Sequence, residues 1–116
     1  MDYKYINTEY LDSVAGGDPE IIREIVILFK EQVVEIFSEM SARFIAKEFK
    51  ALGLLAHKAK SSVSIMGMND LAIMLKTFEL QARENLETGL YESYIIRYKI
   101  ETEGAIKELD NLIQNL

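Results

Sequence analysis

Residues 18–45 read DPEIIREIVILFKEQVVEIFSEMSARFI, and this segment decides the fold class of the chain. Asp18 is suited to cap a helix, and Pro19 is suited to its first position. Apolar residues then recur at spacings of three and four, at Ile22, Ile25, Phe29, Val33, Ile36, Met40 and Phe44. This spacing places one apolar stripe along a helix that runs to about residue 45.

The same spacing predicts helices on both sides of this segment. A short helix precedes it, with Tyr10, Leu11 and Val14 as its apolar face and Gly16-Gly17 at its end. A second long helix is predicted from about Lys47 to Met66, and Gly67 ends it. Its packing residues are Leu52, Leu55, Ala59, Val63 and Met66.

Two more helices complete the prediction. Asn69 or Asp70 is expected to cap the first, which packs through Leu71, Leu75, Phe78, Ala82 and Leu86. Gly89 breaks the chain before the last, whose packing positions are Ile95, Tyr98, Thr102, Ala105, Leu109 and Leu112. Because the connections are short and no strand-like alternation competes, we expect an all-α fold. The expected architecture is an antiparallel up-down four-helix bundle with a short extra N-terminal helix, forming one domain over residues 1–116.

Composition excludes several classes of protein. The chain has no cysteine, so disulfides, thiol nucleophiles and cysteine-rich zinc sites are absent. The N-terminus has no apolar signal-peptide core, and no apolar run approaches the roughly 20 residues of a membrane span. We therefore expect a cytoplasmic protein that does not bind a membrane.

Charge argues against nucleic acid as a partner. The net charge is −6, whereas nucleic-acid binding depends on lysines and arginines that neutralise phosphates. The charge is unevenly placed, however. Between residues 43 and 60 only one acid, Glu48, accompanies five basic residues, Arg43, Lys47, Lys50, Lys58 and Lys60. A local basic field therefore surrounds the single histidine, His57.

His57 is predicted to point outward from its helix. At 100° per residue, the packing residues lie on the opposite side, and Gly53, Lys60, Ser61 and Ser64 lie within about 60° of it. Gly53 and Ser61, one turn before and after His57, are small and would leave the imidazole within reach of another protein. Three apolar residues edge this outward face, namely Leu54, Ile65 and Met68.

Few catalytic or metal sites fit these residues. A zinc site needs three or four ligands, and this chain offers one nitrogen ligand, so no metal site is expected. Ser61 and Ser64 share a helix with His57, and no glycine-rich elbow exposes a nucleophile or builds an oxyanion hole. No P-loop, dinucleotide fingerprint or kinase-type glycine loop is present. A solvated, incidental histidine is the simplest alternative.

Two segments resemble the histidine phosphotransfer (HPt) domain. Residues 56–79, AHKAKSSVSIMGMNDLAIMLKTFE, resemble the family's His-x-x-Lys-Gly-Ser signature and the helix after it. The matching residues are His57, Lys60, Ser62, Met66-Gly67, Leu71, Leu75 and Glu79. Residues 10–32, YLDSVAGGDPEIIREIVILFKEQ, are similar to the family's opening, with its Leu28-Phe29 pair. The resemblance spans about residues 5 to 87.

The resemblance implies a phosphocarrier that is not itself an enzyme. His57 would accept a phosphoryl group from a receiver aspartate, Lys60 would stabilise its charge, and Glu79 would orient the imidazole. The expected partners are response-regulator receiver domains and a hybrid histidine kinase. No cofactor is expected on this chain, because Mg²⁺ belongs to the receiver. The partner surface would comprise Leu11, Val14, Gly53, Leu54, Lys58, Ser61, Ser64, Ile65 and Met68.

One departure from the family pattern leaves alternatives open. The family has glycine after the lysine, and this chain has Ser61. Serine there either crowds a docking receiver or donates a hydrogen bond to the phosphoryl group. A helical adaptor that binds a receiver without phosphorylation therefore stays open, as does a structural or dimerising bundle. The resemblance itself implies a monomer. For Glu79, the alternative is an exposed acid paired with Lys76 or Arg83.

Overall fold

A computed structural model describes residues 3–116, and all regular structure within them is helical. The predicted all-α class is therefore confirmed. The helices are α1 (Thr8–Val14), α2 (Pro19–Ile45), α3 (Phe49–Ile65), α4 (Asn69–Arg83) and α5 (Tyr91–Gln114), with a short 3₁₀ turn, η1 (Thr88–Leu90), before α5. Of the domain expected over residues 1–116, the first two residues lie outside this description.

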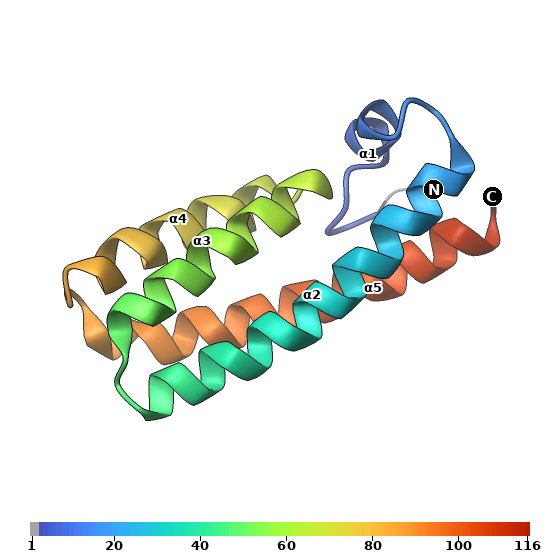
Figure 1. The fold of residues 1–116 in the computed structure, drawn as a ribbon. Coiled ribbons are helices and arrows are strands. Elements are labelled where there is room, and N and C mark those ends of the chain that lie inside the picture. The colour runs from blue at the N-terminus through green and yellow to red at the C-terminus, as the bar shows by residue number, and fades with distance from the viewer. Residues whose placement is uncertain (1–2) are drawn as a thin grey trace.

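The four long helices lie in two layers, α3 with α4 and α2 with α5 (Figure 1). Further contacts join α2 to α3 and α4 to α5, so each long helix packs against two others. The molecule measures 43 × 21 × 20 Å, and its long dimension matches the length of the 27-residue α2. Within the part of the chain that is described, no helix is long and apolar enough to cross a membrane.

The start of α2 follows the sequence prediction. Asp18 has an extended backbone, and its carboxylate accepts a hydrogen bond from the Glu20 amide at 2.9 Å. Pro19, which lacks an amide proton, occupies the first helical position. The buried residues of α2 are Ile22, Val26, Phe29, Val33, Ile36 and Met40. Ile25 and Phe44 of the predicted stripe are only half-buried.

Two helix starts differ from the prediction. Lys47 does not begin α3, because it takes a left-handed conformation (φ 57°) in the turn after α2, and α3 begins at Phe49. Neither Asn69 nor Asp70 caps α4, since Met68 occupies the cap position and both polar residues lie inside the helix. The residue at the cap position, Met68, is buried and makes no side-chain cap hydrogen bond.

The end of α4 also differs from the prediction. Leu86 is expected to pack in the core, yet α4 ends at Arg83 and Leu86 is exposed. The Leu86 amide bonds back to the Gln81 carbonyl at 2.9 Å, after a left-handed turn at Asn85. The buried Tyr91 hydroxyl donates to the Leu86 carbonyl at 2.6 Å. These bonds hold the backbone of Leu86 and leave its side chain in solvent.

The segment before α1 is fixed to α5. The Glu108 carboxylate accepts hydrogen bonds from the amides of Lys4, Tyr5 and Ile6, at 2.7, 2.9 and 3.0 Å. Gly104 allows this approach, because a Cβ at residue 104 would lie 2.2 Å from the Tyr5 ring. The glycine that costs helix propensity within α5 is thus explained by a contact between distant segments.

Candidate functional site

The candidate site centres on His57, in the middle of α3, and Glu79, on the facing side of α4. His57 Nδ1 lies 3.1 Å from Glu79 Oε1. The His57 side chain is 53% exposed, whereas that of Glu79 is 1% exposed. The pair therefore consists of an imidazole at the surface and a carboxylate buried beneath it.

Glu79 has a second partner on its own helix. Its Oε2 lies 2.6 Å from a guanidinium nitrogen of Arg83, one turn further along α4. Burial alone would raise the pKa of Glu79, but the hydrogen bond with His57 and the nearby positive charges of Arg83 and Lys76 outweigh it. The pKa of Glu79 is consequently lowered, so the carboxylate is ionised near neutral pH.

The ionised carboxylate fixes the proton on the imidazole. A carboxylate only accepts hydrogen bonds, so a neutral His57 that bonds to it through Nδ1 must carry its proton there. Nε2 then keeps its lone pair, on a side chain that is 53% exposed. Such a nitrogen is able to act as a nucleophile towards an electrophile brought by another molecule.

The expectation that Glu79 is exposed if it pairs with Arg83 is wrong. Glu79 pairs with Arg83 and is nevertheless buried, because its two oxygens are divided between α3 and α4 partners. Arg83 is the site residue that the sequence reasoning did not assign to the site. Its spacing of four residues after Glu79 was the available signal.

The expected role of Gly53 is also wrong. Gly53 is buried and faces α4, where a Cβ would lie 3.2 Å from the Glu79 carbonyl oxygen and 3.4 Å from the Ala82 Cβ. Its small size lets α3 and α4 approach each other closely enough for Glu79 to reach His57. It does not leave space above the imidazole.

The two serines near His57 bond to their own helix. Ser61 is exposed, and its hydroxyl donates to the His57 carbonyl at 3.4 Å. Ser64 is half-buried, and its hydroxyl donates to the Lys60 carbonyl at 2.7 Å. Both hydroxyls can still accept a hydrogen bond from an approaching molecule.

Two lysines lie next to His57 in the sequence of α3. Lys60, one turn after His57, is half-buried, whereas Lys58 is exposed. Arg83 lies on the α4 side of the pair through its contact with Glu79. The basic field predicted from the sequence is thus joined by a cation from a second helix.

The predicted apolar rim is only partly exposed. Leu54 and Ile65 on α3 and Val14 on α1 are exposed. Leu11 and Met68 are buried, so their assignment to the partner surface is wrong. Leu11 is the residue of α1 that packs into the core, and Met68 turns inward at the start of α4.

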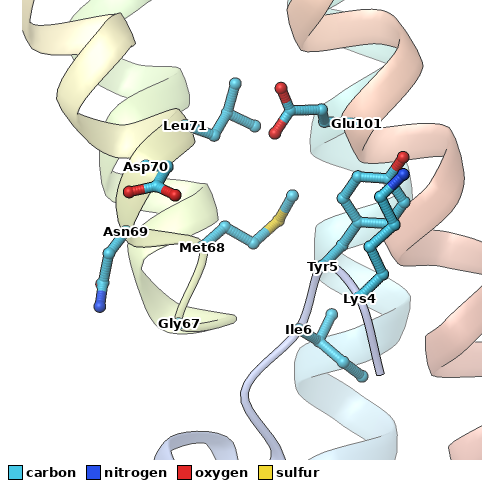
Figure 2. A pocket seen from close by; sticks show the side chains of 9 residues that line it. All are labelled: Lys4, Tyr5, Ile6, Gly67, Met68, Asn69, Asp70, Leu71 and Glu101. Carbon is cyan, nitrogen blue, oxygen red and sulfur yellow. The ribbon is translucent and has the colours of Figure 1, made fainter. Parts of the chain in front are cut away.

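Figure 2 shows the surroundings of Met68, whose side chain points towards the N-terminal segment. It borders a hollow of 320 Å³ that is lined by residues 4–6, residues 67–71 and Glu101. Gly67, which ends α3, has a positive φ and lies against Asn7, where a Cβ would come within 2.5 Å. This corner joins the N-terminal segment to the α3–α4 turn, and neither His57 nor Glu79 lines it.

Within residues 3–116, no group of three or more histidine, aspartate or glutamate side chains converges in a way that could hold a metal ion. The site is therefore described by one imidazole, one buried carboxylate and the cations around them. No protein-family model, curated protein or solved structure matches this chain.

Proposed function

We propose that this chain is a histidine phosphotransfer protein of a two-component phosphorelay. One observation carries the proposal: an exposed imidazole is held through Nδ1 by a buried, ionised carboxylate on the neighbouring helix, at 3.1 Å. A solvated, incidental histidine does not need a buried charge beneath it, since burying a carboxylate is costly unless it is paired. His57 and Glu79 are among the residues that carry the HPt resemblance, and they are the two that form this hydrogen bond.

In this proposal, the long helices form an antiparallel up-down four-helix bundle with α1 across one end. The packing of each long helix against two others supports this arrangement. So does Figure 1, in which successive long helices run in opposite directions and α1 lies at one end. A bundle of this kind gives α3 and α4 a fixed spacing, which the bond between His57 and Glu79 requires.

The reaction transfers a phosphoryl group from a receiver aspartate to His57. The lone pair of Nε2 attacks phosphorus, the Nε2–P bond forms, and the acyl phosphate O–P bond breaks to release the aspartate as a carboxylate. The ring gains positive charge while Nδ1 keeps its proton. Glu79 accepts the hydrogen bond from Nδ1 and stabilises that charge. The reverse sequence delivers the group to a second receiver.

Cations of this chain would stabilise the phosphoryl oxygens. Lys60 lies one turn from His57 on α3 and is the proposed contact, because phosphoryl transfer depends mainly on positioning and on positive charge. Mg²⁺ and the acidic pocket would belong to the receiver, so the chain is a phosphocarrier and not an enzyme. Lys58 would attract that acidic pocket and raise the association rate.

The proposed docking surface is the exposed part of the predicted one. Its exposed residues are Leu54, Lys58, Ser61 and Ile65 on α3 and Val14 on α1, and the half-buried Ser64 lies at its edge. An apolar centre with a charged rim is typical of such interfaces. The partners would be receiver domains and a hybrid kinase in the cytoplasm.

Incubation with a phosphorylated receiver tests the proposal. Label that is acid-labile and alkali-stable is expected on the native chain and not on a His57→Gln variant, and His57 is the only histidine. Receiver binding without label would support the adaptor. Neither label nor binding over a panel of receivers from the same genome would refute both.

Lys60→Ala tests the role of the lysine. We expect slower transfer, because the positive charge beside the phosphoryl oxygens is lost. Thermal unfolding, measured alongside, separates this effect from any loss of packing at the half-buried side chain. Lys107→Ala, an exposed lysine on α5, is the matched control and should transfer at the native rate. Equal rates for both variants would remove the role assigned to Lys60.

A further inference from the structure

Arg83 is bound to the buried carboxylate of Glu79 through the oxygen that does not contact His57. A guanidinium nitrogen lies 2.6 Å from Glu79 Oε2, whereas His57 Nδ1 lies 3.1 Å from Glu79 Oε1. The Arg83 side chain is 48% exposed, and that of Glu79 is only 1% exposed. One buried carboxylate therefore joins a permanent cation to the imidazole, with one oxygen for each.

Arg83 also packs against α3. A Cβ at Gly53 would lie 3.5 Å from the Arg83 Cγ, so the aliphatic part of this side chain lies close to the Gly53 backbone. Gly53 lies one turn before His57 on the same helix. The stem of Arg83 is thus placed on the neighbouring helix while its guanidinium reaches Glu79, unlike an ordinary exposed ion pair whose side chains extend into water.

An ionised carboxylate acts on a histidine in two opposing ways. Its oxygen accepts the hydrogen bond from Nδ1 and so orients the ring of His57. Its negative charge also favours the protonated, positively charged imidazole. Both nitrogens of an imidazolium carry protons, so Nε2 then has no lone pair. A buried Glu79 with no other partner would orient His57 and, at the same time, draw a proton onto it.

Arg83 offsets the second effect. A buried charge is costly unless an opposite charge pairs with it. With Arg83 in place, the charge of Glu79 is paired while His57 stays neutral. Without Arg83, a protonated His57 would be the remaining direct partner of the carboxylate. Other basic side chains on the same parts of α3 and α4 are exposed or half-buried, so water weakens their effect; they are Lys58, Lys60 and Lys76.

We propose that Arg83 is a positioning residue that keeps His57 a neutral nucleophile. It balances the charge of Glu79, so that the carboxylate orients the imidazole without protonating it. Arg83 acts through Glu79 and does not itself hold the phosphoryl group. The importance of this balance for phosphotransfer rests on the proposed function, whereas its effect on the imidazole does not.

Nitrogen-15 spectra of the full chain, labelled at its single histidine, test the proposal. The measured quantity is the fraction of His57 whose Nε2 is unprotonated, at about pH 7.5. Arg83→Gln keeps a hydrogen-bond donor and removes the charge. The His57–Glu79 pair should then bind a proton about tenfold more tightly, and the unprotonated fraction should fall by roughly half. A proton taken by Glu79 lowers the same fraction, because the carboxylic acid would donate to Nδ1 and leave the ring proton on Nε2.

Two further variants separate charge from structure. Arg83→Lys keeps the positive charge and should stay close to the native fraction. Arg97→Gln removes the partner of Glu101 on α5, a pair with the same spacing of four residues, and should leave the ring signals unchanged. Circular dichroism confirms that each variant is helical. A native fraction in Arg83→Gln, or an equal fall in Arg83→Lys, overturns the proposal.

Transfer from a phosphorylated receiver links the balance to the proposed function. Label should appear about twofold more slowly on Arg83→Gln, in proportion to the lost neutral fraction, and Arg83→Lys should recover the native rate. Slower transfer with unchanged ring signals would make Arg83 a direct phosphoryl contact and overturn the proposal. A native chain that takes no label refutes the proposed function, and the ring signals then still decide the role of Arg83.

Discussion

Replacing Glu79 by glutamine tests how the buried carboxylate controls the proton on His57. The carboxylate accepts from His57 Nδ1 at one oxygen and from Arg83 at the other. A glutamine amide keeps the shape but has one accepting oxygen and one donating NH₂ group. Arg83 only donates, so it retains the oxygen and turns the NH₂ group towards His57. The imidazole must then accept at Nδ1, which moves its proton to Nε2.

The size of this shift follows from the strength of the native hydrogen bond. A hydrogen bond to an ionised acceptor contributes about 1.5–3 kcal/mol. Because 53% of the His57 side chain is exposed, water competes and the lower end applies. About 1.5 kcal/mol corresponds to a roughly tenfold preference for the Nδ1–H form in the native chain. The preference should reverse in Glu79→Gln, and Nε2 would no longer offer a lone pair.

Nitrogen-15 chemical shifts of the imidazole measure the two forms directly. The chain has one histidine, so a histidine-labelled sample gives two ring signals that need no further assignment to residues. Spectra are recorded at alkaline pH, where the ring is neutral. Glu84→Gln, an exposed position at the end of α4, is the matched control and should keep the native pattern. A native chain that is mainly Nε2–H, or identical spectra for native chain and Glu79→Gln, would refute the reasoning.

Three further predictions concern stability. The pKa of Glu79 is lowered below its ordinary value of 4.5, so its ionised form contributes stability above that pH. The difference in free energy of unfolding between the native chain and Glu79→Gln, measured by urea unfolding, should therefore shrink on acidification below pH 4.5. A difference that stays constant with pH would contradict this. The buried Tyr98 hydroxyl has no hydrogen-bond partner within residues 3–116, so Tyr98→Phe should stabilise the fold by about 1 kcal/mol in the same assay. A loss of stability would contradict this and would mean that the hydroxyl is hydrogen-bonded. Gly104→Ala should lower the free energy of unfolding by about 1–3 kcal/mol more in the native chain than in a Tyr5→Ala background, where the clash with the ring is absent. Equal effects in this double-mutant cycle would show that Tyr5 does not pack against Gly104.

The sequence predicted the helices better than their ends. The periodicity of α2 and the capping pair Asp18-Pro19 are local features, and both match the structure. The start of α4 does not match, because the buried Met68 occupies the cap position and Asn69 lies inside the helix. The prediction of a helix boundary fails where a side chain outside the local pattern is buried at that boundary.

Sequence reasoning predicted the exposure of His57 but not the position of Gly53. A helical wheel predicts that His57 points outward, and His57 is exposed in the structure. The same wheel predicts that Gly53 points outward, although Gly53 faces α4 in the structure. A wheel describes one helix and contains no information on where its neighbour lies, so it could not assign Gly53 to the α3–α4 contact.

The sequence by itself determined the all-helical class, the extent of the long helix after Pro19 and the position of His57 on its helix. These features depend on interactions between residues a few positions apart, which the order of residues specifies directly. Only the tertiary structure decided that Glu79 is buried beneath His57 and shared with Arg83. That arrangement depends on how closely α3 and α4 approach each other, and the approach is set by packing between segments that the local pattern does not connect.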